Sequence, residues 1–361
     1  MEYVYLLLCF VASILITPLV KKLAIRFNIT DQPNHRKIHQ KAMPRLGGLA
    51  IYLSFIIGLI VSQQDSPYIW PITIGSLIIM VTGILDDAFD LRPKYKLIGQ
   101  LLAALVVIRG GLDVEFINLP FGGQLDFGYL TIPLTILWIV GITNAINLID
   151  GLDGLAAGVS SIALITLSIM AFLQGDIFVV TIAMMLLGST LGFLIYNFHP
   201  AKIFMGDSGA LFLGFMISVL AMLGFKNVTV VSLVIPIIIL GVPISDTFFA
   251  IIRRLINKRP LAAADQHHLH HRIINSGFTH RQAVLIIYGI AIMFSLAAVI
   301  FSMATVWGSI LIVGVVLIAI ELFVEVVGLV SNDYKPLLKF LKPKPSSSGT
   351  GTGTNRYDRN L

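Results

Sequence analysis

Eleven long runs of apolar residues constrain this chain more than any other feature. A helix that spans a bilayer needs roughly 20 mostly apolar residues. The runs lie at 3–20, 47–62, 69–85, 97–112, 130–147, 154–173, 177–196, 208–224, 229–247, 283–302 and 306–328. Only 12% of the residues are charged, whereas soluble domains carry about 25%. We therefore predict an all-α polytopic membrane protein with about 11 transmembrane helices.

The basic residues predict how these helices are oriented. With the N-terminus outside, 23 of the 25 Lys and Arg residues fall in inner segments, and only Arg109 and Lys226 do not. Those segments are 21–46, 86–96, 148–153, 197–207, 248–282 and the tail from 329. Because basic residues in short loops favour the cytoplasm, we expect the C-terminus to be cytoplasmic.

Two segments outside the apolar runs have their own patterns. Residues 113–129 alternate in polarity around Gly122-Gly123, which predicts a small external β-hairpin. Residues from about 343 are of low complexity and are predicted to be disordered. We expect one membrane domain, residues 1–330, whose largest cytoplasmic loop is 248–282, and a cytoplasmic tail, residues 331–361.

Four polar motifs interrupt the apolar runs. They are Asp86-Asp87 with Asp90, the segment from Asn144 to Asp153, Phe204-Met-Gly-Asp207, and the segment from His267 to Arg272. Charged and imidazole groups are costly in or beside a bilayer, so they indicate a functional site. All four lie at the predicted cytoplasmic ends of different helices. We expect them to form one site at the inner membrane face.

The acidic motifs suit a divalent cation. Adjacent carboxylates such as Asp86 and Asp87 either share a cation or repel, so that one keeps its proton. Asp207, in a glycine-flanked turn, suits a hard cation beside phosphates. The plainer alternatives are a helix end turning polar at the interface and, for Asp207, a cap on the following helix. Cys9 is the only cysteine, which excludes a disulfide and a Cys-ligated metal.

The segment 144–153 places polar groups along one side of a helix. Asn144, Asn147 and Asp150 are spaced three apart, which puts them on one face. Together with Asp153 they could hold a base, a ribose or a metal. The alternative is a set of hydrogen bonds between helices, which small polar residues often form in membranes.

Basic and imidazole groups dominate two inner loops. The larger carries His268, His270, His271 and Arg272, and the first inner loop carries Lys41 and Arg45. Imidazole and guanidinium groups suit phosphate oxygens. A zinc site competes for the histidines, and a lipid headgroup contact or a topology signal competes for the first loop.

Taken together, these motifs resemble the polyprenyl-phosphate N-acetylhexosamine-1-phosphate transferases, the superfamily of MraY, WecA and TagO. The resemblance covers residues 1–330 in order and spacing. The His-x-His-His-Arg form at 268–272 and Asn197-Phe-His-Pro-Ala-Lys202 look like the WecA and TagO branch. His267 precedes the motif and receives no role.

The resemblance implies a reaction, a metal and a location. GlcNAc-1-phosphate would pass from UDP-GlcNAc to undecaprenyl phosphate, with release of UMP, as the first membrane step of wall teichoic acid or related glycan synthesis. The metal would be Mg²⁺, or Mn²⁺ in its place. The enzyme would lie in the bacterial cell membrane with its active site facing the cytoplasm. A homodimer stays open, and no nucleic-acid partner is expected.

Roles for single residues follow from the same resemblance. Catalytic roles are implied for Asp86, Asp87, His268 and His270, and metal binding for Asp207 and Asp87. Substrate contacts are implied for Lys41, Arg45, Asn144, Asn147, Asp150, Asp153, Phe204, His271 and Arg272.

Two other functions are weighed against this one. An MraY-type enzyme would use UDP-MurNAc-pentapeptide as its donor. An ion or metabolite transporter would place its acidic residues near mid-span, whereas here they cluster toward one face. The residues also leave open a covalent aspartyl route in place of direct attack by the lipid phosphate.

Overall fold

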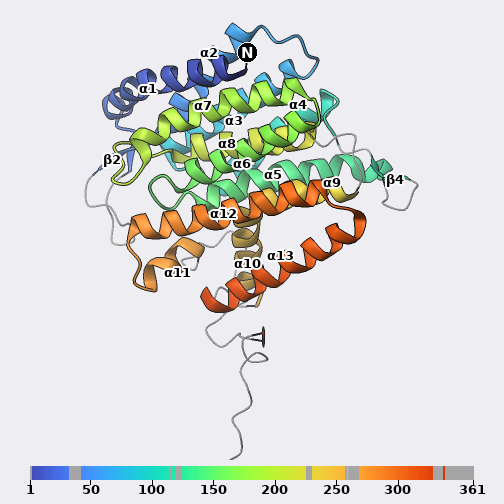
Figure 1. Ribbon diagram of the computed structural model, residues 1–361. Helices are drawn as coiled ribbons and strands as arrows, with labels where there is room; N and C mark the ends of the chain where they lie inside the picture. Colours follow the sequence, from blue (N-terminus) through green and yellow to red (C-terminus); the bar gives the residue numbers. More distant parts are fainter. Residues whose placement is uncertain are drawn as a thin grey trace, which may run out of the picture.

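The computed structural model is almost entirely helical (Figure 1) and describes residues 2–31, 42–113, 116–118, 124–224, 230–256, 258, 268–327 and 336–337. Its helices are α1 (Glu2–Arg26), α2 (Gly47–Ser62), α3 (Ile69–Phe89), α4 (Pro93–Arg109), η1 (Gly128–Leu130), α5 (Thr131–Ile149), α6 (Leu155–Leu173), α7 (Ile177–Asn197), α8 (Gly206–Gly224), α9 (Val230–Ile239), α10 (Gly241–Ile256), α11 (Leu269–Asn275), α12 (His280–Met303) and α13 (Val306–Val327). Two small antiparallel sheets pair β1 (Thr30–Asp31) with β2 (Met43–Pro44) and β3 (Phe116–Asn118) with β4 (Gln124–Asp126).

Each predicted apolar run is helical over most of its described residues, and the protein is a multi-pass membrane protein. Among the described residues, seven helices are long and apolar enough to cross a bilayer. They are α1, α3, α5 with η1, α6, α7, α8 and α12. Helix α2 and residues 307–322 of α13 are apolar but shorter. The count of about 11 spans and the orientation stay predictions.

The ninth predicted span, 229–247, is two helices and not one. Helix α9 ends at Ile239, and α10 continues to Ile256, through residues predicted to belong to the loop 248–282. Pro243 explains the break, because it has no N–H for the carbonyl of Ile239 and its ring crowds that carbonyl. Figure 1 shows α10 running steeply across the direction of the long helices.

Helix α8 is the centre of the bundle. It packs against α2, α3, α5, α6 and α7, and most of its side chains are buried. Helix α2 approaches it very closely: a Cβ on Gly48 would lie 2.0 Å from the backbone nitrogen of Gly209. Small residues allow such approach between membrane helices. The contact joins the first turns of α2 and α8.

Local signals end α3 and begin α4 and α12 at the same end of the bundle. Asp90 stops α3 in the left-handed conformation (φ 47°), and Pro93 begins α4, where a missing N–H costs nothing. Thr279 and Gln282 form a capping box at the start of α12.

The two ends of the bundle differ in character. Figure 1 shows β4 at one end, and β2 and α11 at the other. The predicted hairpin within 113–129 is confirmed by β3 and β4. The predicted disordered tail lies outside the described residues.

Candidate active site

A short backbone pairing brings the loop before α2 against the loop before α8. Arg45 and Phe204 form a parallel bridge, and the Phe204 N–H donates to the carbonyl of Pro44 at 2.8 Å. The N–H groups of Gly47 and Gly48 donate in turn to the carbonyls of Phe204 and Met205, at 3.0 and 2.8 Å. Arg45 is thereby held beside the start of α8.

Asp87 caps helix α8 from another helix. Its Oδ1 accepts the backbone N–H of Asp207 at 2.8 Å, and its Oδ2 accepts that of Ser208 at 3.1 Å. A carboxylate at a helix N-terminus also interacts favourably with the helix dipole. Both oxygens of Asp87 are therefore engaged, and the side chain of Asp207, which sequence reasoning considered as the cap, is left for other partners.

Two cations bridge the carboxylates. The Arg45 guanidinium contacts Asp87 at 3.1 Å, Asp207 at 3.0 Å and Asp90 at 3.2 Å. The Lys96 ammonium lies 2.9 Å from Asp207 Oδ2 and also contacts Asp86. Charge-assisted pairs of this kind are stronger than neutral hydrogen bonds.

Asp86 and Asp207 share Lys96 as a cationic partner and lie close enough for a side-chain hydrogen bond between them. Asp86 is only 1% exposed; its Oδ1 accepts the N–H of Leu91 at 2.8 Å, while its Oδ2 faces Lys96. An all-oxygen pair around one cationic position suits a hard cation such as Mg²⁺. These residues fit the predicted metal.

A cavity of about 420 Å³ opens beside this cluster. Its wall includes Asp31, Arg45, Asp150, Gly151, Leu152, Asp153, Asn197, His199, Phe204, Met205, Gly206, Asp207, His271 and His280. The lining comes from the connections α1–α2, α5–α6 and α7–α8, from the facing ends of α7 and α8, and from α11 and the start of α12. The acidic pair 86–87 lies behind this wall.

The surroundings of the Asp150 carboxyl favour its protonated form. Burial, followed by repulsion from Asp207 and Asp87, raises the pKa of Asp150 to about 8. A neutral Asp150 could donate a hydrogen bond to a ligand in the cavity. A cation bound near Asp207 would oppose this effect.

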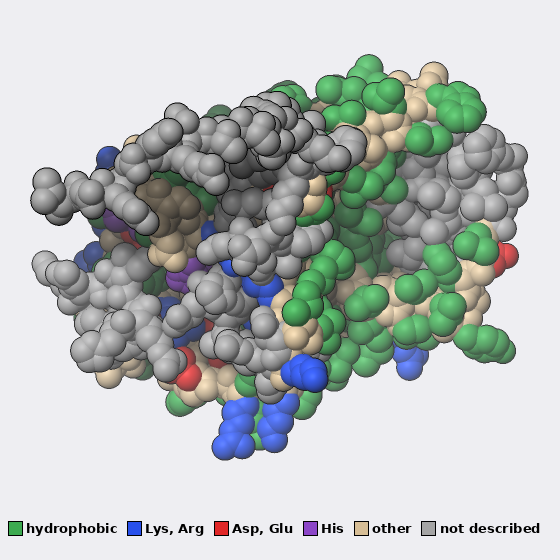
Figure 2. Space-filling model, turned by 90° about the horizontal axis from the view of Figure 1, so that it is seen from below, with side chains coloured by type: hydrophobic (Ala, Val, Ile, Leu, Met, Phe, Trp, Pro, Cys, Tyr) green, Lys and Arg blue, Asp and Glu red, His purple; other side chains and the backbone are tan. Residues whose placement is uncertain are grey.

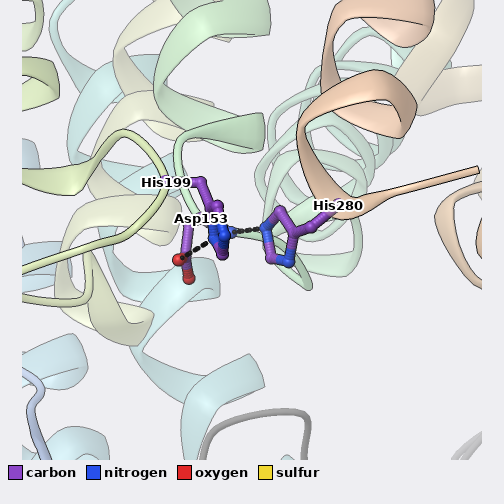
Figure 3. Close-up of side chains that lie close together, drawn as sticks. All are labelled: Asp153, His199 and His280. Carbon is purple, nitrogen blue, oxygen red and sulfur yellow. Dashed lines mark hydrogen bonds and ion pairs between the residues drawn. The ribbon is translucent and has the colours of Figure 1, made fainter.

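Asp153 is held by two histidines from distant segments (Figure 3). His199 Nδ1 lies 2.8 Å from Asp153 Oδ2, which also accepts the N–H of Ala201 at 3.1 Å. The backbone N–H of Asp153 donates to His280 Nε2 at 2.9 Å. The ligand atoms of Asp153, His199 and His280 lie within 4.8 Å of one another, so these residues could hold a metal.

Within the predicted histidine segment, His268 precedes α11 and residues 269–272 form its first turn; this part of the chain is hydrogen-bonded to α10. Asp246 accepts the N–H of Leu269 at 2.9 Å and contacts His268 Nδ1 at the same distance. His270 is 3% exposed and packs against Gly151. Burial, then repulsion from His271, lowers the pKa of His270 to about 3. Of the predicted histidines within the described residues, only His271 lines the cavity.

The structure therefore gathers some predicted residues and separates others. Arg45, Asp86, Asp87, Asp150, Asp153, Phe204, Asp207 and His271 meet in the cluster or the cavity wall. Asn144 instead exchanges hydrogen bonds with Gln100 of α4, at 2.7 and 3.2 Å, as in the interhelical alternative. Asn147, His268, His270 and Arg272 are not among the described lining residues. Lys41 and His267 lie outside the described residues.

Sequence reasoning missed four residues of this site. Lys96 was counted only as part of a basic loop, although it follows Asp87 by nine positions. His199 was quoted within a motif without a role, and His280 and Asp246 were not singled out. Their signal was present, because each is an ionisable residue in or beside an apolar run.

Polar and apolar surfaces divide along the length of the bundle. In the view of Figure 2, hydrophobic side chains cover most of the described surface toward the right. Histidine and most basic side chains lie toward the left and centre, and the left is the end that holds α11 in Figure 1.

Comparisons with known proteins agree on one family. The family model for glycosyl transferase family 4 matches residues 69–225. A probable undecaprenyl-phosphate N-acetylglucosaminyl 1-phosphate transferase of Bacillus subtilis (strain 168) is 49% identical, over 93% of this chain and 96% of the relative. A decaprenyl-phosphate N-acetylglucosaminephosphotransferase of Mycolicibacterium smegmatis is 33% identical over 74% of each chain. A phospho-N-acetylmuramoyl-pentapeptide-transferase of Halalkalibacterium halodurans is 33% identical, over 81% of this chain and 95% of the relative.

Proposed function

Because the chain belongs to glycosyl transferase family 4, we propose that it transfers GlcNAc-1-phosphate from UDP-GlcNAc to undecaprenyl phosphate and releases UMP. The 49% identical relative bears the name of this activity. The product, undecaprenyl-diphospho-GlcNAc, would be the first membrane intermediate of wall teichoic acid or related glycan synthesis.

The observation that carries this proposal is the cluster of Asp86, Asp207, Arg45 and Lys96 at the cavity. Joining a lipid phosphate to a sugar diphosphate brings several negative charges together. Phosphoryl transfer therefore depends mainly on positioning and on cations that offset this charge. Arg45 and Lys96 would supply such cations, and Arg45 lines the cavity.

The predicted Mg²⁺ would be held by Asp86 and Asp207, with Asp87 fixing the backbone around them. When bound, the ion would supply charge neutralisation and Lewis-acid assistance at the phosphates. Lys96, which now bridges these two carboxylates, would then be free to contact a phosphate.

The cavity wall offers contacts for the donor. Phe204 can stack on a planar base, and Asp150 and Asp153 offer polar groups around it. His271 reaches the same cavity from α11 and suits the sugar-phosphate side. These residues would hold the nucleotide while its diphosphate lies near Arg45 and Asp207.

We favour direct attack. An oxygen of the lipid phosphate forms a bond to the β-phosphorus of UDP-GlcNAc, and the bond from that phosphorus to the bridging oxygen breaks. The electron pair leaves with UMP. Asp86 would orient the acceptor phosphate through the cations beside it, because Leu91 holds its Oδ1 and its Oδ2 faces the position that Lys96 now occupies. The acceptor lies at headgroup depth, which suits a site at the helix ends.

The test is a detergent assay of the purified full-length protein with UDP-GlcNAc. We expect UMP release that requires both a polyprenyl phosphate and Mg²⁺, which a transporter could not produce. Asp207→Asn should lower turnover at least about tenfold, which corresponds to a loss of about 1.4 kcal/mol of transition-state stabilisation. Asp126→Asn, in the exposed β4 strand at the other end, is the control and should leave it unchanged.

The same assay tests the MraY-type alternative, which the similarity to the phospho-N-acetylmuramoyl-pentapeptide-transferase of Halalkalibacterium halodurans supports. UDP-MurNAc-pentapeptide replaces UDP-GlcNAc, with all else unchanged. Faster turnover of the pentapeptide donor would overturn the proposed donor. Equal rates for wild type and Asp207→Asn would contradict the proposed metal site.

A further inference from the structure

His199 and His280 hold different atoms of one residue. His199 binds the Asp153 carboxylate through Nδ1, and His280 binds its backbone N–H through Nε2. His199 belongs to the loop between α7 and α8, whereas His280 is the first residue of α12. The adjacent Arg281 donates from Nε to the carbonyl of His199 at 3.1 Å. The first turn of α12 thus fastens two loops together.

The hydrogen bonds fix the role of each ring nitrogen. His280 Nε2 faces a backbone N–H, so it must accept, and the ring is then neutral with its proton on Nδ1. His199 Nδ1 faces a carboxylate oxygen, so it donates. Asp153 Oδ2 accepts hydrogen bonds from His199 Nδ1 and from the backbone N–H of Ala201. Among the described residues, no hydrogen bond reaches Oδ1, and Asp153 lines the cavity.

This bonding favours positioning over metal binding. A metal needs the lone pairs of both rings to converge on one point. Here the lone pair of His280 is engaged by a peptide N–H, and the two rings stack with centroids 4.2 Å apart and planes 21° apart. An ion at this position would leave the Asp153 N–H without its partner, which is costly.

We propose that His199 and His280 are positioning residues that set the donor affinity of the enzyme by holding Asp153 in the cavity wall. His199 holds one carboxylate oxygen against the wall, and His280 fixes the peptide, so that the second oxygen is presented to a hydrogen-bond donor of the nucleotide. The inference rests on the proposed function, since it takes the cavity as the nucleotide site.

The expected signature is a change in KM for the donor. Asp153 lies on the nucleotide side, so its contact would be made equally in the ground state and the transition state. Loss of such uniform binding raises KM and leaves kcat nearly unchanged. A purely structural role would instead lower the fraction of active enzyme, and therefore kcat.

The experiment compares four variants of the full-length protein. His199→Ala and His280→Ala remove the hydrogen bonds. His199→Asn keeps an N–H donor near the Nδ1 position, and His280→Gln keeps an acceptor near the Nε2 position. Donor KM should rise about tenfold in each alanine variant, with kcat within about threefold of wild type. The Asn and Gln variants should return KM to within about threefold.

Calorimetric titration with UMP supplies a readout without turnover, and the same ordering of affinities is expected. Unchanged KM and UMP affinity in the alanine variants, or a loss confined to kcat, would overturn the positioning role. Stoichiometric Zn²⁺ binding lost in both alanine variants would overturn it in favour of a metal site. If the wild-type protein binds UMP but shows no turnover, only the proposed function is refuted. If the wild-type protein does not bind UMP, both the proposed function and the positioning role are overturned.

Discussion

Gly206 and Asp87 meet where three helices converge, and their contact shows how little space the acidic cluster leaves. Gly206 has φ +74°, and a Cβ there would lie 2.5 Å from Asp87 Oδ2. Asp87 can cap α8 only because nothing stands between its carboxylate and the first N–H groups of that helix. A side chain at 206 would displace the carboxylate or the cap.

We expect Gly206→Ala to lower turnover at least about tenfold. The substitution strains a left-handed backbone by about 1–2 kcal/mol and pushes Asp87 away from α8. Gly175→Ala is a matched control, because Gly175 has nearly the same φ, +75°, but nothing within 4 Å of the added Cβ. The measurement is the initial rate of UMP release by each variant. Equal rates in the two variants would show that the contact between residue 206 and Asp87 does not affect turnover.

His270 predicts a pH dependence of stability. Its folded pKa is about 3, below the ordinary value of 6.5, because it is buried and beside His271. Between these values the unfolded chain binds a proton that the folded protein does not. The contribution of neutral His270 to the free energy of unfolding is therefore complete above pH 6.5. It is lost as the pH falls toward 3, by at most about 1.4 kcal/mol per pH unit.

His270→Gln should reduce the fall in Tm between pH 7 and about pH 5. The measurement is thermal unfolding of both proteins in detergent across that range. Other groups titrate equally in the two proteins, so only the difference between their slopes is used. Identical slopes would mean that His270 accepts a proton in the folded state.

At the scale of elements, α10 determines where α11 lies. The Asp246 carboxylate, on α10, accepts the backbone N–H of Leu269 and contacts the His268 ring. Helix α11 also contains His271, which lines the cavity. Beyond the break between α9 and α10, α10 crosses the direction of the long helices (Figure 1), and its Asp246 meets the histidine segment.

Asp246→Ala should lower turnover about tenfold, because it leaves two buried donors without their acceptor and releases α11. Hydrogen bonds to charged groups contribute about 1.5–3 kcal/mol. Asp246→Asn retains a carbonyl oxygen for Leu269 and should lose less. The measurement is the rate of UMP release by both variants. An alanine variant as active as wild type would show that the position of α11 does not affect catalysis.

At the scale of the whole molecule, β4 lies at one end of the bundle (Figure 1). Strand β2, which directly precedes Arg45 of the acidic cluster, lies at the other end. The segregation of basic residues predicts that the cluster end faces the cytoplasm. A protein with this arrangement would meet a nucleotide donor on one side and keep its hairpin on the other.

Cysteine labelling in cells tests this orientation. Cys9 is buried and is the only cysteine, so Cys9→Ala gives a cysteine-free background. In that background, Asp126→Cys in β4 should react with a membrane-impermeant maleimide in intact cells. Asn275→Cys in α11 should react only after permeabilisation, and both positions are exposed. The reverse pattern would invert the predicted orientation.

The sequence predicted elements well and junctions less well. Helices that cross a bilayer require apolar runs of a certain length, and those runs are visible in the chain, so each of the eleven segments is helical over most of its described residues. The division of 229–247 was missed because both halves are apolar, and only the backbone effect of Pro243 separates them. The hairpin was found because its alternating polarity and paired glycines are local signals.

The sequence by itself determined that this is a helical membrane protein with ionisable groups at the helix ends, since burial in lipid is a property of composition along the chain. Only the tertiary structure decided which of those groups meet. It joined Arg45 and Lys96 to Asp207, made Asp87 the cap of α8 and drew His199 and His280 to Asp153, while it turned Asn144 toward Gln100. The physical reason is distance along the chain: Arg45 and Asp207 are 162 positions apart, and only packing around α8 brings them together.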